Sequence, residues 1–155
     1  MYNRIVVPLD GSDLASEALA HAKDLAKRLD VPLHLVRAVD PTVGAGIGPI
    51  GMGFDYTAVS ELITEEEQDA TAFIDTQVSA LTSDGYTVTG VVLRGYAAAA
   101  IKSATQDGDL VAMASHGRTG VKRWFLGSVA EEVLRQATVP VLLIRNPRED
   151  DEGRR

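Results

Sequence analysis

Hydrophobic residues along the chain alternate between short continuous runs and stripes with helical spacing. Each continuous run suits a buried strand of a parallel sheet, and the runs lie at residues 5–8, 33–39, 87–93, 110–114 and 141–144. Between the runs, apolar residues recur every three or four positions on one helical face. This spacing predicts helices over residues 14–29, 61–81, 96–105 and 128–137.

The regular alternation of strands and helices predicts an α/β protein. The expected architecture is a doubly wound, five-stranded parallel sheet with helices on both faces. In such sheets, ligands bind beyond the carboxyl ends of the strands, where the strand order reverses. We expect one domain over residues 1–146, followed by a charged tail at residues 147–155.

Composition narrows the function classes. The net charge of -7 argues against a nucleic-acid-binding protein, which usually has a basic face. No cysteine is present, so a disulfide framework and a zinc–cysteine site are both excluded, and the three histidines are too scattered to indicate a metal site. No apolar stretch reaches the roughly 20 residues that span a membrane, and no signal peptide is evident. We therefore expect a cytoplasmic protein with no membrane partner.

A glycine-containing loop joins the strand at 110–114 to the helix at 128–137. A strand, a loop of small residues and a helix form a layout that wraps phosphate groups, because backbone N–H groups and the helix N-terminus face the anion. Gly117 and Gly127 flank the loop, and Arg118 carries a charge that suits a phosphate. Ser128 either caps the helix or donates its hydroxyl to a phosphate oxygen. The alternative is that the glycines only make turns and Ser128 is only a cap.

The turn after the first strand is a second candidate site. Asp10 lies at the carboxyl end of this strand, where its carboxylate either accepts hydrogen bonds from a ribose or caps the next helix. Ser12 is the favoured cap. His116 is expected to support its loop or contact phosphate, since no partner for a general base is evident. The glycines of residues 46–51 match a dinucleotide fingerprint, but they open no helix, so we reject the match.

The last apolar run, residues 139–144, contains a proline that is tolerated at a strand start or on a sheet edge. An edge strand this apolar promotes association unless it is covered. Pairing of Val141–Ile144 with its own copy about a two-fold axis would cover it. We therefore expect a homodimer through this strand; the alternative is that a helix or the tail covers it.

Together, these segments resemble the universal stress protein family nearly from end to end. The resemblance rests on residues 5–12 (IVVPLDGS), residues 115–120 (SHGRTG) with 126–130 (LGSVA), and residues 139–144 (VPVLLI). Nucleotide-binding members of the family carry a glycine, two residues, a second glycine, nine residues, and then glycine with serine or threonine. Gly117, Gly127 and Ser128 fit this pattern, whereas Ala114 stands in the place of the first glycine.

The resemblance implies the strand order 3-2-1-4-5, a homodimer through the last strand, and a site for ATP in which Mg or Mn bridges the phosphates. By this resemblance, Asp10 would hold the ribose, and Pro8, Ala38 and Met113 would line the adenine pocket. Leu9, Ser12 and Val39 adjoin these residues and complete that half of the site. The phosphates would be held by Ala114, Ser115, His116, Gly117, Arg118, Gly127, Ser128 and Val129.

Three functions remain open. The first is a stress-response protein that binds ATP, or another adenine nucleotide, as a regulatory ligand. The second is an interaction module of the same fold that does not bind nucleotide, which Ala114 favours. The third is a weak ATPase, although no pairing of a nucleophile with a base is evident and we predict no catalytic residue. If the site is placed correctly, Gly127→Val should weaken nucleotide binding and leave the fold largely intact.

Overall fold

The computed structural model describes residues 1–41, 56–116 and 126–145, and gives no side-chain placement for residues 56–59. The predicted loop at 41–53 falls outside this part of the chain from residue 42 on, as do Gly117, Arg118 and the charged tail. The elements are β1 (Arg4–Pro8), α1 (Asp13–Leu29), β2 (Leu33–Val39), α2 (Tyr56–Ser83), β3 (Val88–Arg94), α3 (Ala97–Ala104), β4 (Asp109–Ala114), α4 (Ser128–Gln136) and β5 (Val141–Ile144).

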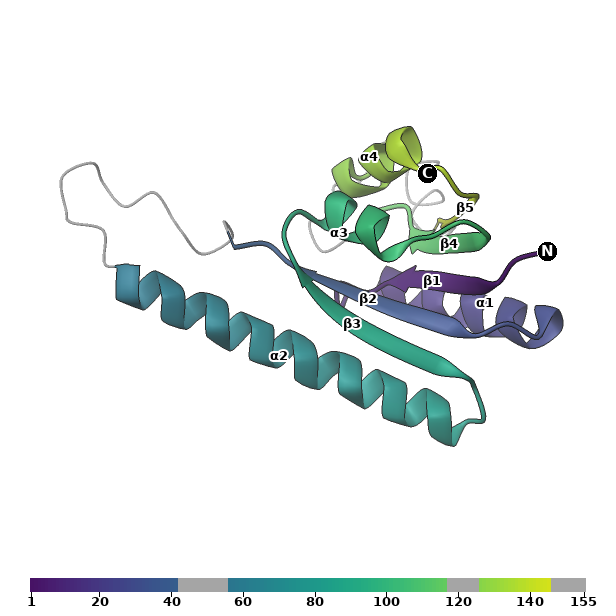
Figure 1. Cartoon of the computed structure of the whole chain (residues 1–155), viewed down its shortest axis with the longest axis horizontal. Helices are drawn as coiled ribbons and strands as arrows, with labels where there is room; N and C mark the ends of the chain where they lie inside the picture. Colours follow the sequence, from purple (N-terminus) through teal and green to yellow (C-terminus); the bar gives the residue numbers. More distant parts are fainter. Residues whose placement is uncertain (42–55, 117–125, 146–155) are drawn as a thin grey trace, which may run out of the picture.

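The strands form one parallel sheet in the order β3-β2-β1-β4-β5 (Figure 1). This order confirms the prediction from the sequence. β1 is the central strand: Ile5 lies opposite Leu33 of β2 on one side and opposite Leu110 of β4 on the other. The chain first builds outward from β1 to β3 and then crosses to the other side of β1 to add β4 and β5. The strand order therefore reverses between β1 and β4.

Helices cover both faces of the sheet (Figure 1). On one face, α1 and α2 pack over a core that includes Ile5, Leu35 and Ala112. On the other face, α3 and α4 pack over a core that includes Val6 and Val111. Neighbouring residues of one strand thus belong to opposite cores, as the alternation of side chains along a strand requires.

α2 is longer than predicted. It begins at Tyr56, five residues before the expected start at residue 61, and it contains 28 residues. At 1.5 Å per residue it is about 42 Å long, whereas the seven residues of β3 span about 23 Å. The fully buried positions of its described side chains begin at Ala70. The N-terminal part of the helix therefore projects past the sheet (Figure 1).

A buried ion pair joins β1 to β4 at the amino-terminal edge of the sheet. The Arg4 guanidinium donates to both carboxylate oxygens of Asp109, each at 2.9 Å, and Asp109 is 0% exposed. Arg4 also donates to the carbonyl of Ala104 at 2.8 Å, and the backbone N–H of Gln106 donates to Asp109. These contacts fix the end of α3 against the sheet. The pKa of His34 in β2 is lowered, mainly because the side chain is partly buried and secondarily because the positive charge of Arg4 is near.

Candidate functional site

Two turns that the sequence singled out meet at the carboxyl edge of the sheet. One follows β1 at Leu9 and Asp10, and the other follows β4 at Ser115. β1 and β4 are hydrogen-bonded neighbours, so the reversal of strand order lies between the turns. Neighbouring strands hold both turns: the N–H of Leu9 donates to Val36 at 2.8 Å, and the N–H of Ser115 donates to Ile144 at 2.8 Å. The topological switch point of the sheet, where ligands of such folds bind, therefore lies between these two turns.

The first turn is held by its own side chains. A carboxylate oxygen of Asp10 accepts a hydrogen bond from the N–H of Ser12 at 2.9 Å. Ser12 is the N-cap of α1, and its hydroxyl accepts from the N–H of Ala15 at 3.2 Å. The expectation that Ser12 is the cap is confirmed, and the alternative in which Asp10 caps the helix is wrong. Gly11 between them has a φ of 82°, which only glycine adopts without strain.

Arg37 lies beneath this turn, and the sequence analysis missed it. Its guanidinium donates to the carbonyl of Leu9 at 3.4 Å and lies 5.4 Å from the centre of the Phe73 ring. Arg37 shares a face of β2 with Leu33 and Leu35, which belong to the α1/α2 core. A charged residue at a core-facing position of a strand is the sequence signal that could have identified Arg37. Its contacts make it a support for the turn.

The second turn is closed by a backbone contact. The N–H of Gly127 donates to the carbonyl of Ser115 at 2.8 Å, so the start of α4 is held against the end of β4. A side chain on Gly127 would place its Cβ 2.9 Å from the Cα of His116. The φ of Gly127 is −63°, so this close approach, rather than a left-handed backbone, requires the glycine. The Nδ1 of His116 lies 3.0 Å from the hydroxyl of Ser115, so the two neighbouring side chains of this turn are in contact.

The N-terminus of α4 has no side-chain cap. Its N-cap is Gly127, so the interpretation of Ser128 as the cap is wrong: Ser128 is the first residue of the helix and is exposed. Within the described ranges, the backbone N–H groups of Ser128, Val129 and Ala130 have no hydrogen-bond acceptor. The first N–H groups of a helix attract anions through their partial positive charge.

Ala114 takes the place of a family glycine without backbone strain. It lies in β4, and among the described non-glycine residues only Asp30 has a positive φ. Its side chain packs against the α1/α2 core. The neighbouring Met113 belongs to the opposite, α3/α4 core. The Ala114 methyl group therefore points to the face of the sheet opposite Met113.

The structure brings most of the remaining predicted residues to the same edge. Pro8 and Ala38 are half-buried, whereas Leu9, Val39 and Met113 are 4%, 1% and 4% exposed. The side chains of Leu9 and Val39 are buried. Their carbonyls also have partners, because that of Leu9 accepts from the Arg37 guanidinium and that of Val39 accepts from the N–H of Gly95. Their contribution is thus mainly to hold β1 and β2 in place.

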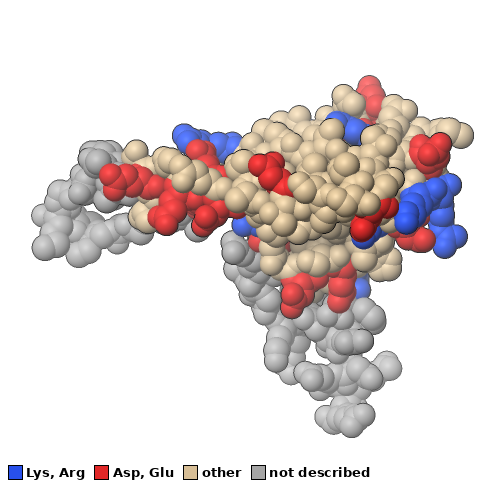
Figure 2. All heavy atoms as spheres, turned by 90° about the horizontal axis from the view of Figure 1, so that it is seen from below, with Lys and Arg blue, Asp and Glu red and all other residues tan. Residues whose placement is uncertain are grey.

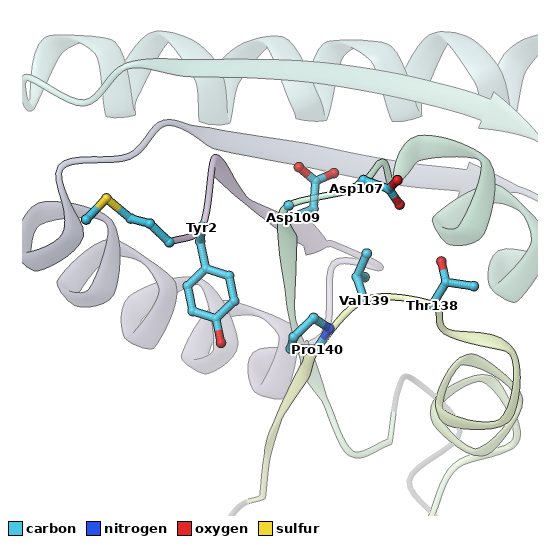
Figure 3. A pocket seen from close by; sticks show the side chains of 8 residues that line it. Tyr2, Asp107, Asp109, Thr138, Val139 and Pro140 are labelled. Carbon is cyan, nitrogen blue, oxygen red and sulfur yellow. The ribbon is translucent and has the colours of Figure 1, made fainter.

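A hollow of about 490 Å³ lies at the opposite, amino-terminal edge (Figure 3). It is lined by Met1, Tyr2, Asp107, Gly108, Asp109, Thr138, Val139 and Pro140. Tyr2 comes from the start of the chain, while Val139 and Pro140 precede β5 (Figure 3). None of the residues predicted for the nucleotide site lines this hollow, so it is a separate feature.

Acidic side chains gather on the projecting half of α2 (Figure 2). Glu61, Glu65 and Asp69 are exposed there. Glu67 instead pairs with Arg94 at the end of β3, and hydrogen bonding to this guanidinium lowers the pKa of Glu67. The pair fastens α2 to the edge of the sheet. Within the described part of the chain, no three His, Asp or Glu side chains are grouped so that they could hold a metal ion.

The fold and its edge define a doubly wound α/β protein with an uncapped helix N-terminus at the switch point. The chain belongs to the universal stress protein family, whose family model matches residues 1–145. No helix among the described residues is long and apolar enough to cross a membrane.

Relatives and solved structures agree with this assignment. Universal stress protein MJ0531 of Methanocaldococcus jannaschii is 33% identical over 97% of this chain and 86% of its own length. Universal stress protein YxiE of Bacillus subtilis is 27% identical over 94% of this chain and its whole length. The solved structure of MJ0577 from M. jannaschii superposes with a TM-score of 0.78 at 26% identity, covering 94% of this chain and 97% of MJ0577.

Proposed function

We propose that the chain binds ATP, or another adenine nucleotide, as a regulatory ligand at the carboxyl edge of β1 and β4. The observation that carries this proposal is the start of α4, where three backbone N–H groups lack acceptors among the described residues and Gly127 lets the helix start close to the end of β4. A polyphosphate satisfies such groups and adds favourable charge at the helix end. We place the polyphosphate at residues 114–118 and at Gly127, Ser128 and Val129.

The nucleoside part would lie toward β1 and β2. Asp10 keeps a carboxylate at the mouth of the site, and we assign it to the ribose hydroxyls. Pro8, Ala38 and Met113 would line the base. Two structures that share this fold support an adenine nucleotide. One is a universal stress protein in complex with cAMP, and the other is the protein from Archaeoglobus fulgidus in complex with dAMP.

A divalent metal ion, Mg or Mn, would bind together with the nucleotide and bridge its phosphates. Asp10 is the carboxylate at this edge, and the described residues contain no cluster of three metal-ligating side chains. Phosphate oxygens would therefore supply most of the ligands of the ion. When bound, the ion would neutralise phosphate charge. The chain's own part is to present backbone N–H groups to the remaining oxygens.

The nucleotide would act in a cytoplasmic homodimer. β5 pairs with β4 on one side and, within the described residues, has no strand on its other side. Leu142 is 36% exposed on this edge strand. A second copy of Val141–Ile144 would cover the apolar edge. A ligand bound near the start of α4 can regulate such a dimer only by its different affinity for two states of the protein.

Calorimetric titration with ATP tests the nucleotide site. Ser128→Asp adds a carboxylate to the first turn of α4, where it favours the helix but repels phosphate. Thr138→Asp is the matched control, because it adds the same charge at an exposed position on the amino-terminal edge. We expect ATP to bind the unaltered chain, Ser128→Asp to lose at least about tenfold in affinity, and Thr138→Asp to bind normally.

Two results would contradict the proposal. One is an unaltered chain that neither releases adenine nucleotide on denaturation nor binds added ATP. That result favours an interaction module without a ligand. The other is Ser128→Asp with unchanged affinity, which would move the phosphates away from α4.

A further inference from the structure

The base side of the proposed nucleotide site lies on one face of the sheet. Val6, Val36 and Met113 belong to the core under α3 and α4. Side chains two residues apart in a strand point to the same face. Pro8 therefore points to the face of Val6, and Ala38 to the face of Val36. All three residues assigned to the base lie on the α3/α4 side of the carboxyl edge.

α3 starts at this place. Leu93 of β3 lies opposite Ala38 of β2, and the N–H of Gly95 donates to the carbonyl of Val39 at 2.9 Å. These contacts hold the end of β3 beside the end of β2. The φ of Gly95 is 133°, and the chain turns there. Tyr96 follows directly as the N-cap of α3.

Tyr96 is a large aromatic residue that folding leaves in water. It is 66% exposed, more than any other aromatic side chain in the described part of the protein. Its side chain makes no capping hydrogen bond, and no other partner for it occurs among the described residues. Ala98, two residues further on, is 5% exposed in the α3/α4 core, so the start of the helix is firmly seated. The backbone at Tyr96 is therefore held near the end of β2, and its side chain is exposed.

We propose that Tyr96 is a specificity-determining residue whose ring forms the outer wall of the base site. This inference rests on the proposed nucleotide function. Pro8, Ala38 and Met113 provide an apolar floor but no aromatic ring, so they leave one face of a bound purine open to water. Tyr96 directly follows Gly95, whose N–H is hydrogen-bonded to the residue after Ala38, so we assign its ring as the flat surface for that face. A base gains affinity by stacking on such a ring, while a polyphosphate without a base gains nothing.

Titrations of four proteins with ATP and with tripolyphosphate test the role of Tyr96. Tyr96→Ala removes the ring, and Tyr96→Phe keeps the ring but removes the hydroxyl. Leu62→Ala is the control, because Leu62 is 53% exposed on the projecting half of α2. Urea unfolding of each variant checks that the fold is retained.

We expect Tyr96→Ala to weaken ATP binding by about 5- to 150-fold while its tripolyphosphate affinity stays within twofold of the unaltered chain. Tyr96→Phe and Leu62→Ala should bind both ligands normally. If the unaltered chain binds ATP and Tyr96→Ala binds it equally well, the role of Tyr96 is wrong and the nucleotide site stands. Equal losses for ATP and tripolyphosphate would also overturn it. If the unaltered chain binds no ATP, the proposed function itself fails, and the role of Tyr96 fails with it.

Discussion

Substitution of Gly127 by alanine should destabilise the protein through a backbone contact. The new Cβ would lie 2.9 Å from the Cα of His116, and 3.2 Å from both the Cβ of His116 and the carbonyl oxygen of Ser115. Two of these atoms belong to the backbone at the end of β4, so no side chain can rotate away to relieve the contact. The start of α4 must move instead.

The cost follows from two effects. Overpacking at a tight contact costs about 1–3 kcal/mol. Moving α4 also weakens the hydrogen bond from Gly127 to Ser115, which measures 2.8 Å and contributes about 1 kcal/mol. We expect Gly127→Ala to lose about 2–3 kcal/mol of unfolding free energy, and its Tm to fall by about 4–12 °C. The expectation that Gly127→Val leaves the fold largely intact is revised accordingly, since valine is larger still.

Urea and thermal unfolding, followed by circular dichroism, measure this loss. Ser128→Ala is the matched control: it lies one residue away, its side chain is exposed, and alanine is a good helix former, so its stability should change by less than about 0.5 kcal/mol. A Gly127→Ala protein as stable as the unaltered chain would refute the close approach of α4 to β4.

Three further predictions concern the sheet. Arg4→Ala leaves the buried carboxylate of Asp109 without its partner and should cost about 3–5 kcal/mol in urea unfolding; a double variant with Asp109→Ala should regain part of that loss. Gly90→Ala brings a Cβ against the Cγ2 atom of Ile74 in α2 and should cost about 1–3 kcal/mol, whereas a smaller loss in the background of Ile74→Ala, which lacks that Cγ2, would identify the clash as the cause. Because burial lowers the pKa of His34, the unfolded chain binds a proton that the folded chain resists; stability should therefore fall as the pH drops below about 6.5, and His34→Gln should flatten that slope. An unchanged slope in His34→Gln would assign the pH dependence to other groups.

Most of the architecture could be predicted from the sequence. Short apolar runs and helical stripes located the five strands and four helices of the described residues, because the two faces of a parallel sheet impose strong patterns on both. The strand order came from the family resemblance and is confirmed. The start of α2 was placed too late because the acidic residues after Glu61 look like a first helical turn. Residues 56–60 contain no residue that stops a helix, so the helix extends through them.

The site was harder to predict, because its properties come from contacts between distant segments. The motif placed Gly127 and Ser128 at the start of the last helix, where the structure has them. It did not reveal that Gly127 is the N-cap, or that the glycine is needed for its approach to His116. Arg37 and Tyr96 were missed for the same reason. Their neighbours, Leu9 in one case and the end of β2 in the other, adjoin them only through the sheet.

The unequal lengths of α2 and the sheet imply a gradient of local stability along one helix. From Ala70 onward, buried side chains tie α2 to β2 and β3, so its amide hydrogens should exchange only when the core opens. Residues 60–66 have no buried side chain and depend mainly on their own helical hydrogen bonds, and isolated helices of this size are marginal in water. Exchange should therefore be fast near residue 60 and slow down toward Leu81, so that one continuous helix belongs to two cooperative units.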